Sequence, residues 1–265
     1  MASYKPVTAA LRVLEVLASV NRLYGRATVA AIHQQTGINK ATIVRMLETL
    51  SEAGYVLRDA DQPVYRITGK SLMLSAGFER HKVFAAIVAP LLDDFRKAIG
   101  WPSDVALFDH DAMLVIESSR QGGPLSFNRA PGYRAPVLGT SLGLAYIAHC
   151  QEGERARLLE LVAKDEAPWN DLARAPDRLE ETLTMIRSQG YATMDPHYSR
   201  QEYDNRIDSI GIAITSANTV FASINVIYLK SALNRETARD TLLGPLQKVA
   251  DQMAEKLVAQ SSDQS

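Results

Sequence analysis

Basic and polar side chains gather at the start of a helix that the sequence predicts over residues 40–50. Lys40, Thr42 and Arg45 lie off its apolar stripe. That stripe has the i, i+3, i+4, i+7 spacing of one buried helix face and consists of Ile43, Met46, Leu47 and Leu50. Asn39 comes just before the helix and offers a side-chain oxygen as its N-cap. Side chains on the first turns of such a helix can reach base edges and phosphates, so the pattern predicts a DNA-recognition helix.

The flanking segments fit a winged helix-turn-helix. A short helix begins near Val29, and Gly37 follows it where a tight turn needs positive φ. After Gly54, two β-prone runs (55–58 and 64–68) enclose the turn cluster 59–63 and predict a hairpin wing. We therefore expect DNA contacts from Arg26, Thr28, Asn39, Lys40, Thr42, Arg45, Arg58 and Arg66. The alternative is a generic helical hairpin with a solvated charged face.

The charge distribution agrees with a DNA-binding N-terminal part. Residues 1–80 contain ten Lys and Arg against six Asp and Glu, a balance of +4, whereas the whole chain has a net charge of −1. Phosphate contacts supply most non-specific affinity for DNA, and this balance gives one copy only a few cations. We therefore expect a dimer that binds two half-sites of a double-stranded operator.

Composition and length place the chain in a broad class. A length of 265 residues suits two domains, and 46% apolar with 22% charged residues is typical of a well-packed soluble protein. The single cysteine, Cys150, excludes an intramolecular disulfide and favours a reducing compartment. The N-terminus lacks the apolar core of a signal peptide, and no apolar run reaches membrane-span length. These features predict a cytoplasmic protein with no membrane partner.

We predict an α+β fold with three parts. These are a winged helix-turn-helix domain (1–68), a linker helix (69–82) and a second domain (83–265). In the first part, a helix over 7–21 would bury Leu11, Leu14, Leu17 and Ala18. In the second domain, an antiparallel sheet would be covered by helices. Its strands are expected at 105–109, 112–118, 125–130, 191–194, 209–216 and 220–229, and its helices at 83–99, 141–150, 151–164, around 179–189, and in the C-terminal segment with Leu242, Leu246, Val249, Met253 and Leu257.

The turn at Gly139–Leu142 could bind an anion. A helix begins at Thr140–Ser141, and the free N–H groups of a first helical turn attract negative charge. Asn225 lies in an apolar strand, where its amide needs a buried partner. Tyr228 could bring a hydroxyl near a ligand. Alternatively, Ser141 is a simple N-cap, Asn225 is satisfied by backbone, and Tyr228 packs at the strand end. The apolar walls of such a site would be Val105, Leu107, Val115 and Ile224.

Over nearly its full length the chain resembles IclR-type transcriptional regulators. The winged helix followed by Gly54–Tyr55 carries the N-terminal half of the likeness, and GYRAPVLGTSLGLAYIA (132–148) carries the C-terminal half. WPSDVALFDHDAMLVIES (101–118), LSFNRA (125–130) and SINVIYLKSA (223–232) are similar to the members that activate 3-(3-hydroxyphenyl)propionate catabolism.

The resemblance implies the fold of the second domain and its ligand. The fold would be GAF-like, in a homodimer or homotetramer with no cofactor. A small aromatic carboxylate would bind against the Gly139–Leu142 turn, on the backbone N–H groups of Ser141 and Leu142. Family positions carried over elsewhere are Asp195, Ser209 and Asn225. The implied role is activation of an aromatic acid catabolic operon through an effector-driven shift between two conformations.

Two other classes of protein are alternatives. One is an enzyme that acts on a small carboxylate and carries a winged-helix appendage. Its candidate groups would be Ser141, His149 and Cys150, but the helix rise separates Ser141 from His149 by about 12 Å, too far for proton transfer. A metal at Asp195 and His197 has only a weak i, i+2 signature, and we expect a solvated loop that folds over the pocket there, with no metal and no catalysis. The other is a purely structural DNA-binding protein, which the well-marked second domain argues against.

Overall fold

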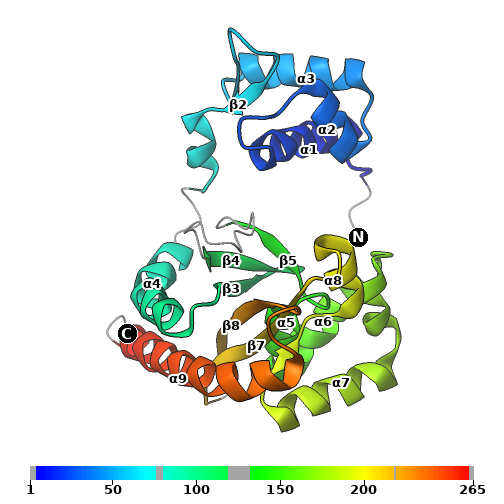
Figure 1. The fold of residues 1–265 in the computed structure, drawn as a ribbon. Coiled ribbons are helices and arrows are strands. Elements are labelled where there is room, and N and C mark those ends of the chain that lie inside the picture. Colours follow the sequence, from blue (N-terminus) through cyan, green and yellow to red (C-terminus); the bar gives the residue numbers. More distant parts are fainter. Residues whose placement is uncertain (1–3, 76–79, 119–131, 218, 263–265) are drawn as a thin grey trace. The chain divides into compact units, whose positions relative to one another are not determined.

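The computed structural model describes residues 4–75, 80–118, 132–217 and 219–262. It divides into two compact units, residues 1–79 and 80–265, which we describe separately (Figure 1). Within the described residues, no helix is both long enough and apolar enough to cross a membrane.

The first unit is a winged helix-turn-helix, as predicted. Its elements are α1 (Thr8–Arg22), α2 (Val29–Thr36), α3 (Lys40–Glu52), β1 (Val56–Arg58) and β2 (Tyr65–Ile67). Gly37 ends α2 with a φ of 67°, in the left-handed region. The Asn39 side chain caps α3 by accepting a hydrogen bond from the Ala41 N–H at 2.9 Å. The predicted stripe of α3 is buried, and β1 and β2 pair antiparallel to form the wing.

The prediction for the buried face of α1 was largely wrong. Leu11 and Leu14 are 56% and 62% exposed, whereas Val16 and Val20 are buried. The helix carries two apolar stripes with helical spacing. The one through Val16 and Val20 packs on α2 and α3, and this choice depends on tertiary contacts that periodicity cannot resolve.

The segment after the wing forms a short 3-10 helix, η1 (Gly69–Ser75), where a longer linker helix was expected. Leu72, Met73 and Leu74 are all exposed on it. Residues 76–79 lie outside the described part of the chain.

The second unit has an antiparallel six-stranded sheet of order β5-β4-β3-β8-β7-β6, which confirms the α+β class. The strands are β3 (Ser103–Asp109), β4 (Ala112–Ser118), β5 (Arg134–Pro136), β6 (Ala192–Thr193), β7 (Ile207–Ser216) and β8 (Thr219–Leu229). The sequence did not predict β5, and the strand expected at 125–130 lies outside the described residues.

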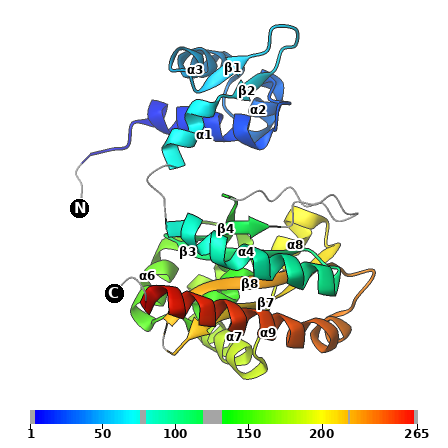
Figure 2. The same cartoon turned by 90° about the vertical axis from the view of Figure 1, so that its left-hand side faces the viewer.

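Helices cover both faces of this sheet (Figures 1 and 2). Helices α4 (Arg80–Ile99) and α9 (Arg235–Ser262) pack on one face, around a core that includes Val105, Ile224 and Leu246. Helix α5 (Ser141–His149) packs on the other face, chiefly on β7 and β8, with α6 (Glu152–Val162) and α7 (Pro176–Gln189) beyond it. We call these the α9 face and the α5 face.

The polar stretch after Met194 is a helix, not the solvated loop that its composition suggested. Helix α8 (Pro196–Tyr203) begins with the Asp195 side chain accepting hydrogen bonds from the N–H groups of His197 and Tyr198. A 3-10 helix that was not predicted, η2 (Pro168–Arg174), packs beside it through Trp169. Local capping at Asp195 outweighs the low apolar content of the segment.

Candidate DNA-binding surface and effector site

Helix α3 presents the basic residues predicted for DNA recognition. Lys40 and Arg45 are exposed, and Thr42 is partly buried beside them. Asn39 and Thr28 cap α3 and α2, respectively, with their side-chain oxygens. Arg26 is exposed just before α2. The capped, exposed first turn of α3 has the form needed to enter a major groove.

The two wing arginines differ in their surroundings. Arg58 is exposed at the end of β1. Arg66 forms an ion pair with Asp59, with a nitrogen–oxygen distance of 3.0 Å. Backbone hydrogen bonds in the wing turn and the charge of Arg66 hold the pKa of Asp59 below its usual value. Arg66 is therefore partly neutralised where it lies.

The start of α5 is buried against the sheet. Thr140 is the N-cap, since its hydroxyl accepts a hydrogen bond from the Gly143 N–H, so the alternative role for Ser141 as N-cap was wrong. Ser141 and Leu142 are fully buried. A Cβ at Gly211 of β7 would lie 2.6 Å from the Ser141 carbonyl oxygen. This close approach brings the first turn of α5 directly onto the middle of β7.

Three of the predicted effector residues meet on the α5 face. The hydroxyls of Ser141 and Ser209 are 2.7 Å apart. Asn225 lies on β8 opposite Gly211, and its side-chain oxygen accepts a hydrogen bond from the Asp104 N–H at 2.9 Å. The amide of Asn225 is thus partly satisfied by backbone, as the alternative reading held.

Other predicted residues are distributed differently. Val115 packs on the α5 face and Gly139 lies next to Tyr198, whereas Asp195 uses its carboxylate to cap α8. Tyr228 belongs to the α9 face, and its buried hydroxyl has no hydrogen-bond partner in the described structure. The proposed walls Val105, Leu107 and Ile224 also lie on the α9 face. Side chains alternate between the two faces of a strand. Ile224 and Tyr228 are one and three positions from Asn225 on β8, so they lie on the opposite face from it.

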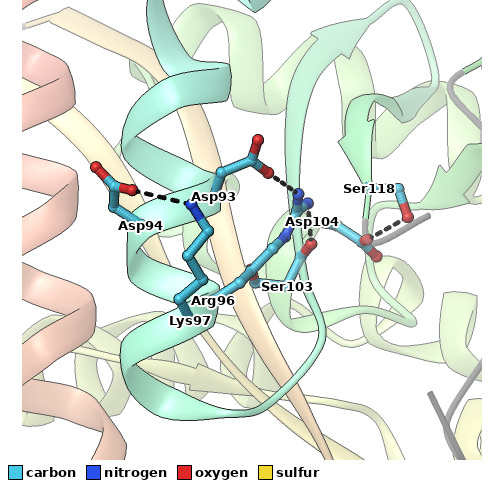
Figure 3. A network of polar contacts seen from close by, with 7 residues as sticks. All are labelled: Asp93, Asp94, Arg96, Lys97, Ser103, Asp104 and Ser118. Carbon is cyan, nitrogen blue, oxygen red and sulfur yellow. Dashed lines mark hydrogen bonds and ion pairs between the residues drawn. The ribbon is translucent and has the colours of Figure 1, made fainter. Parts of the chain in front are cut away.

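Sequence reasoning missed several polar and aromatic residues beside this site. Asp104 and Ser118 are buried, and the Ser118 hydroxyl donates a hydrogen bond to the Asp104 carboxylate at 2.7 Å (Figure 3). Tyr198 stacks edge-on against Trp169, and the hydroxyls of Tyr198 and Tyr133 are 2.8 Å apart. An aspartate inside the apolar run of β3 was the available signal for Asp104, just as Asn225 was noticed in β8.

The groups proposed for the enzyme alternative do not form a catalytic arrangement. His149 directs its Nδ1 at the Ala145 carbonyl oxygen, 2.9 Å away within its own helix. Burial and the nearby Glu154 raise the pKa of the Cys150 thiol to about 11, which disfavours the nucleophilic thiolate. Ser141 pairs with Ser209 rather than with a base.

In the comparison with known proteins, each of the two units matches a family model of its own. Residues 9–60 match the model of the IclR helix-turn-helix domain, and residues 78–255 match that of the bacterial transcriptional regulator IclR C-terminal domain. The transcriptional repressor IclR of Escherichia coli K12 is 24% identical over 196 residues, 73% of this chain and 70% of that protein. The DNA-binding transcriptional repressor YiaJ of the same strain is 23% identical over 231 residues, 86% of this chain and 80% of that protein.

Solved structures share the fold. An IclR-family regulator from Brucella abortus aligns with a TM-score of 0.63 at 22% identity, over 95% of this chain and 93% of that one. An IclR homologue from Microbacterium hydrocarbonoxydans, solved with 4-hydroxybenzoate, aligns with a TM-score of 0.62 at 18% identity, over 93% of this chain and 99% of that one.

A winged helix-turn-helix joined to a sheet domain of this kind defines a DNA-binding transcriptional regulator rather than an enzyme. The chain belongs to the IclR family of bacterial regulators.

Proposed function

We propose that the second unit binds a small aromatic carboxylate and that this ligand controls operator binding by the first unit. The observation that carries the proposal is the buried first turn of α5, which has the Ser141–Ser209 hydroxyl pair beside it and Asn225 on the adjacent strand. N–H groups at a helix start favour a carboxylate. The complex of the Microbacterium homologue with 4-hydroxybenzoate supports an aromatic acid.

We further propose that the protein binds a near-palindromic operator as a homodimer or a dimer of dimers. The modest charge of one N-terminal unit makes two half-sites necessary for useful affinity. The exposed apolar residues Leu11 and Leu14 on α1, with Leu72 and Met73 on η1, supply a surface that a second copy would cover.

The regulated genes are proposed to encode aromatic acid breakdown, with the protein acting as an activator in the cytoplasm. This part follows the resemblance of residues 101–118 and 223–232 to the hydroxyphenylpropionate activators. The E. coli relatives named above are repressors, so in vitro transcription from the operator, with and without effector, determines the direction of control.

A thermal-shift screen of aromatic acids tests the effector. A ligand at a hundredfold excess over its Kd stabilises the folded state by about 2.7 kcal/mol, which raises the Tm measurably. Calorimetry on Ser209→Ala should then show weaker binding, because the hydroxyl pair is broken. Tyr228→Phe is the matched control, since it removes a hydroxyl from the α9 face. An equal loss of ligand affinity in both variants, or unchanged affinity in Ser209→Ala, would place the ligand elsewhere.

A further inference from the structure

A row of residues crosses four strands on the α5 face. Ser118 of β4 pairs with Asp104 of β3, Asp104 pairs with Asn225 of β8, and Asn225 pairs with Gly211 of β7. Directly paired residues of antiparallel strands project from the same face of a sheet. The three side chains of this polar row therefore lie on the same face as α5.

The row is buried and holds a carboxylate. Asp104 is 2% exposed, and Asn225 and Ser118 are 1% and 4% exposed. Burying an acid is costly unless hydrogen-bond donors face it, and the Ser118 hydroxyl is one such donor, 2.7 Å from one carboxylate oxygen. Acids are seldom buried to this depth in an otherwise apolar strand, and this one places a hydrogen-bond acceptor on the α5 face.

The polar row ends beneath the start of α5. The Ser141 carbonyl closely approaches Gly211, so Gly211 marks the position of the first helical turn. Asp104 is two strands away from Gly211. At about 4.8 Å per strand, the acid lies roughly 10 Å from the helix start. That span suits a one-ring acid with its carboxylate at α5 and its far edge at Asp104.

A second observation on the same face also points to a ligand. Ser223 lies two residues before Asn225 on β8, so it projects from the same side of the sheet. Its hydroxyl is fully buried and has no hydrogen-bond partner in the described part of the chain. Buried hydroxyls are nearly always satisfied, so an orphan beside the polar row indicates an incomplete network.

The charge of Asp104 is partly balanced from the other side of the strand. Arg96 of α4 donates hydrogen bonds to the Ser103 hydroxyl and carbonyl, at 3.1 and 2.7 Å (Figure 3). Burial lowers the pKa of this guanidinium, and the negative charge of Asp104 opposes that shift. A ligand at Asp104 therefore does not need to carry a cation, and a neutral donor is sufficient.

We propose that Asp104 accepts a hydrogen bond from a hydroxyl on the effector, at the end away from its carboxylate. This rests on the proposed function, and it narrows the effector class to hydroxylated aromatic acids. Asp104 would also repel a carboxylate bound in the reverse orientation, so it fixes which end of the ligand faces α5.

The test compares ligand pairs that differ by one hydroxyl, with the full-length protein in calorimetry. The pairs are benzoate with 4-hydroxybenzoate, and 3-phenylpropionate with 3-(3-hydroxyphenyl)propionate. A hydrogen bond to a charged acceptor should favour the hydroxylated member of at least one pair by about tenfold or more. Asp104→Asn, which is isosteric, should reduce that preference several-fold and leave the affinity for the unhydroxylated member unchanged. An unaltered preference in a folded Asp104→Asn variant would overturn the proposal.

Ser118→Ala provides a second variant in case Asp104→Asn fails to fold. It removes one internal donor to the Asp104 carboxylate but keeps the carboxylate itself, so the preference for the hydroxylated acid should rise. An unchanged preference would show that Asp104 does not contact the ligand. Wild-type protein that binds both members of each pair equally refutes the role of Asp104 while the aromatic effector stands. Wild-type protein that binds operator DNA but neither member refutes both the aromatic effector and the role of Asp104.

Discussion

The basic residues of the first unit are not equivalent. Lys40 and Arg45 are exposed on the first turns of α3, whereas Arg66 is held by Asp59 in the wing. A guanidinium on the recognition helix can form a bidentate contact with guanine, and an ammonium provides a point charge for phosphate. Replacing Arg45 and replacing Lys40 should therefore have different effects on DNA binding.

Arg45→Ala should weaken operator binding by about 1–3 kcal/mol per half-site and relax base specificity there. Lys40→Gln should weaken binding to all sequences alike and reduce the salt dependence of log K by about 1 per half-site. Fluorescence anisotropy over a salt series measures both effects. Lys97→Gln, an exposed lysine of the second unit, is the control. Unchanged affinity in both α3 variants would remove α3 from the interface.

Asp59→Asn should strengthen DNA binding. The amide retains the oxygen that accepts hydrogen bonds from the Asp61 and Gln62 N–H groups, so the wing turn is kept while the charge on Arg66 is released. The gain in DNA affinity should become smaller as salt is added, because salt screens interactions between exposed charges. Anisotropy at low and high salt measures it. The double variant Asp59→Asn with Arg66→Gln should lose the gain, and a gain that persists would mean that Arg66 is not responsible.

Among the elements, those with a strong local pattern were predictable. The stripe of α3, the capped turn before it and the apolar strands β7 and β8 follow from periodicity and turn chemistry, and the structure confirms them. Helix α8 was missed because its stability comes from the cap at Asp195 and from packing of Tyr198. The buried stripe of α1 was misassigned because two stripes had helical spacing and only tertiary contacts choose between them.

The candidate site was predictable only in part. The start of α5 and Asn225 could be found, since a glycine turn before a helix and an amide in an apolar strand are local signals. Strand alternation alone would have separated Tyr228 from Asn225, because they are three residues apart. Asp104 and Ser118 could not be connected to Asn225 from sequence, since the connection depends on the register of three strands.

Gly211→Ala tests the approach of α5 to β7. The added methyl group would lie 2.6 Å from the Ser141 carbonyl oxygen, which is backbone and cannot move aside cheaply. Overpacking of this kind costs about 1–3 kcal/mol, so the Tm should fall and effector binding should be lost. Gly153→Ala is the control, because nothing lies within 4 Å of its added Cβ. A Gly211→Ala variant with wild-type Tm and ligand affinity would contradict the close packing.

For the whole molecule, operator binding depends on assembly of copies, because the N-terminal unit of one copy carries only a modest positive charge. Leu11 and Leu14 are exposed on α1, so replacing both by Gln should change the intrinsic stability of the unit by less than about 0.5 kcal/mol per site. If a second copy covers them, the double variant should dissociate and lose binding to a full operator. Analytical ultracentrifugation and anisotropy measure the two effects. Glu15→Gln on the same helix is the control, and an assembly that survives the leucine changes would place the dimer contact elsewhere.

The close packing of α5 also limits where substitutions can change the ligand to which such a protein responds. A Cβ at Gly143 would lie 2.1 Å from the Val137 carbonyl oxygen, and one at Gly211 would strike Ser141, so both positions are closed to variation. In the proposed effector site, the end that would face the carboxylate is therefore built from main chain that selection cannot easily alter. New ligand preferences should arise instead at Asp104, Ser118 and Asn225. Libraries selected for a changed inducer should accumulate substitutions there and retain both glycines.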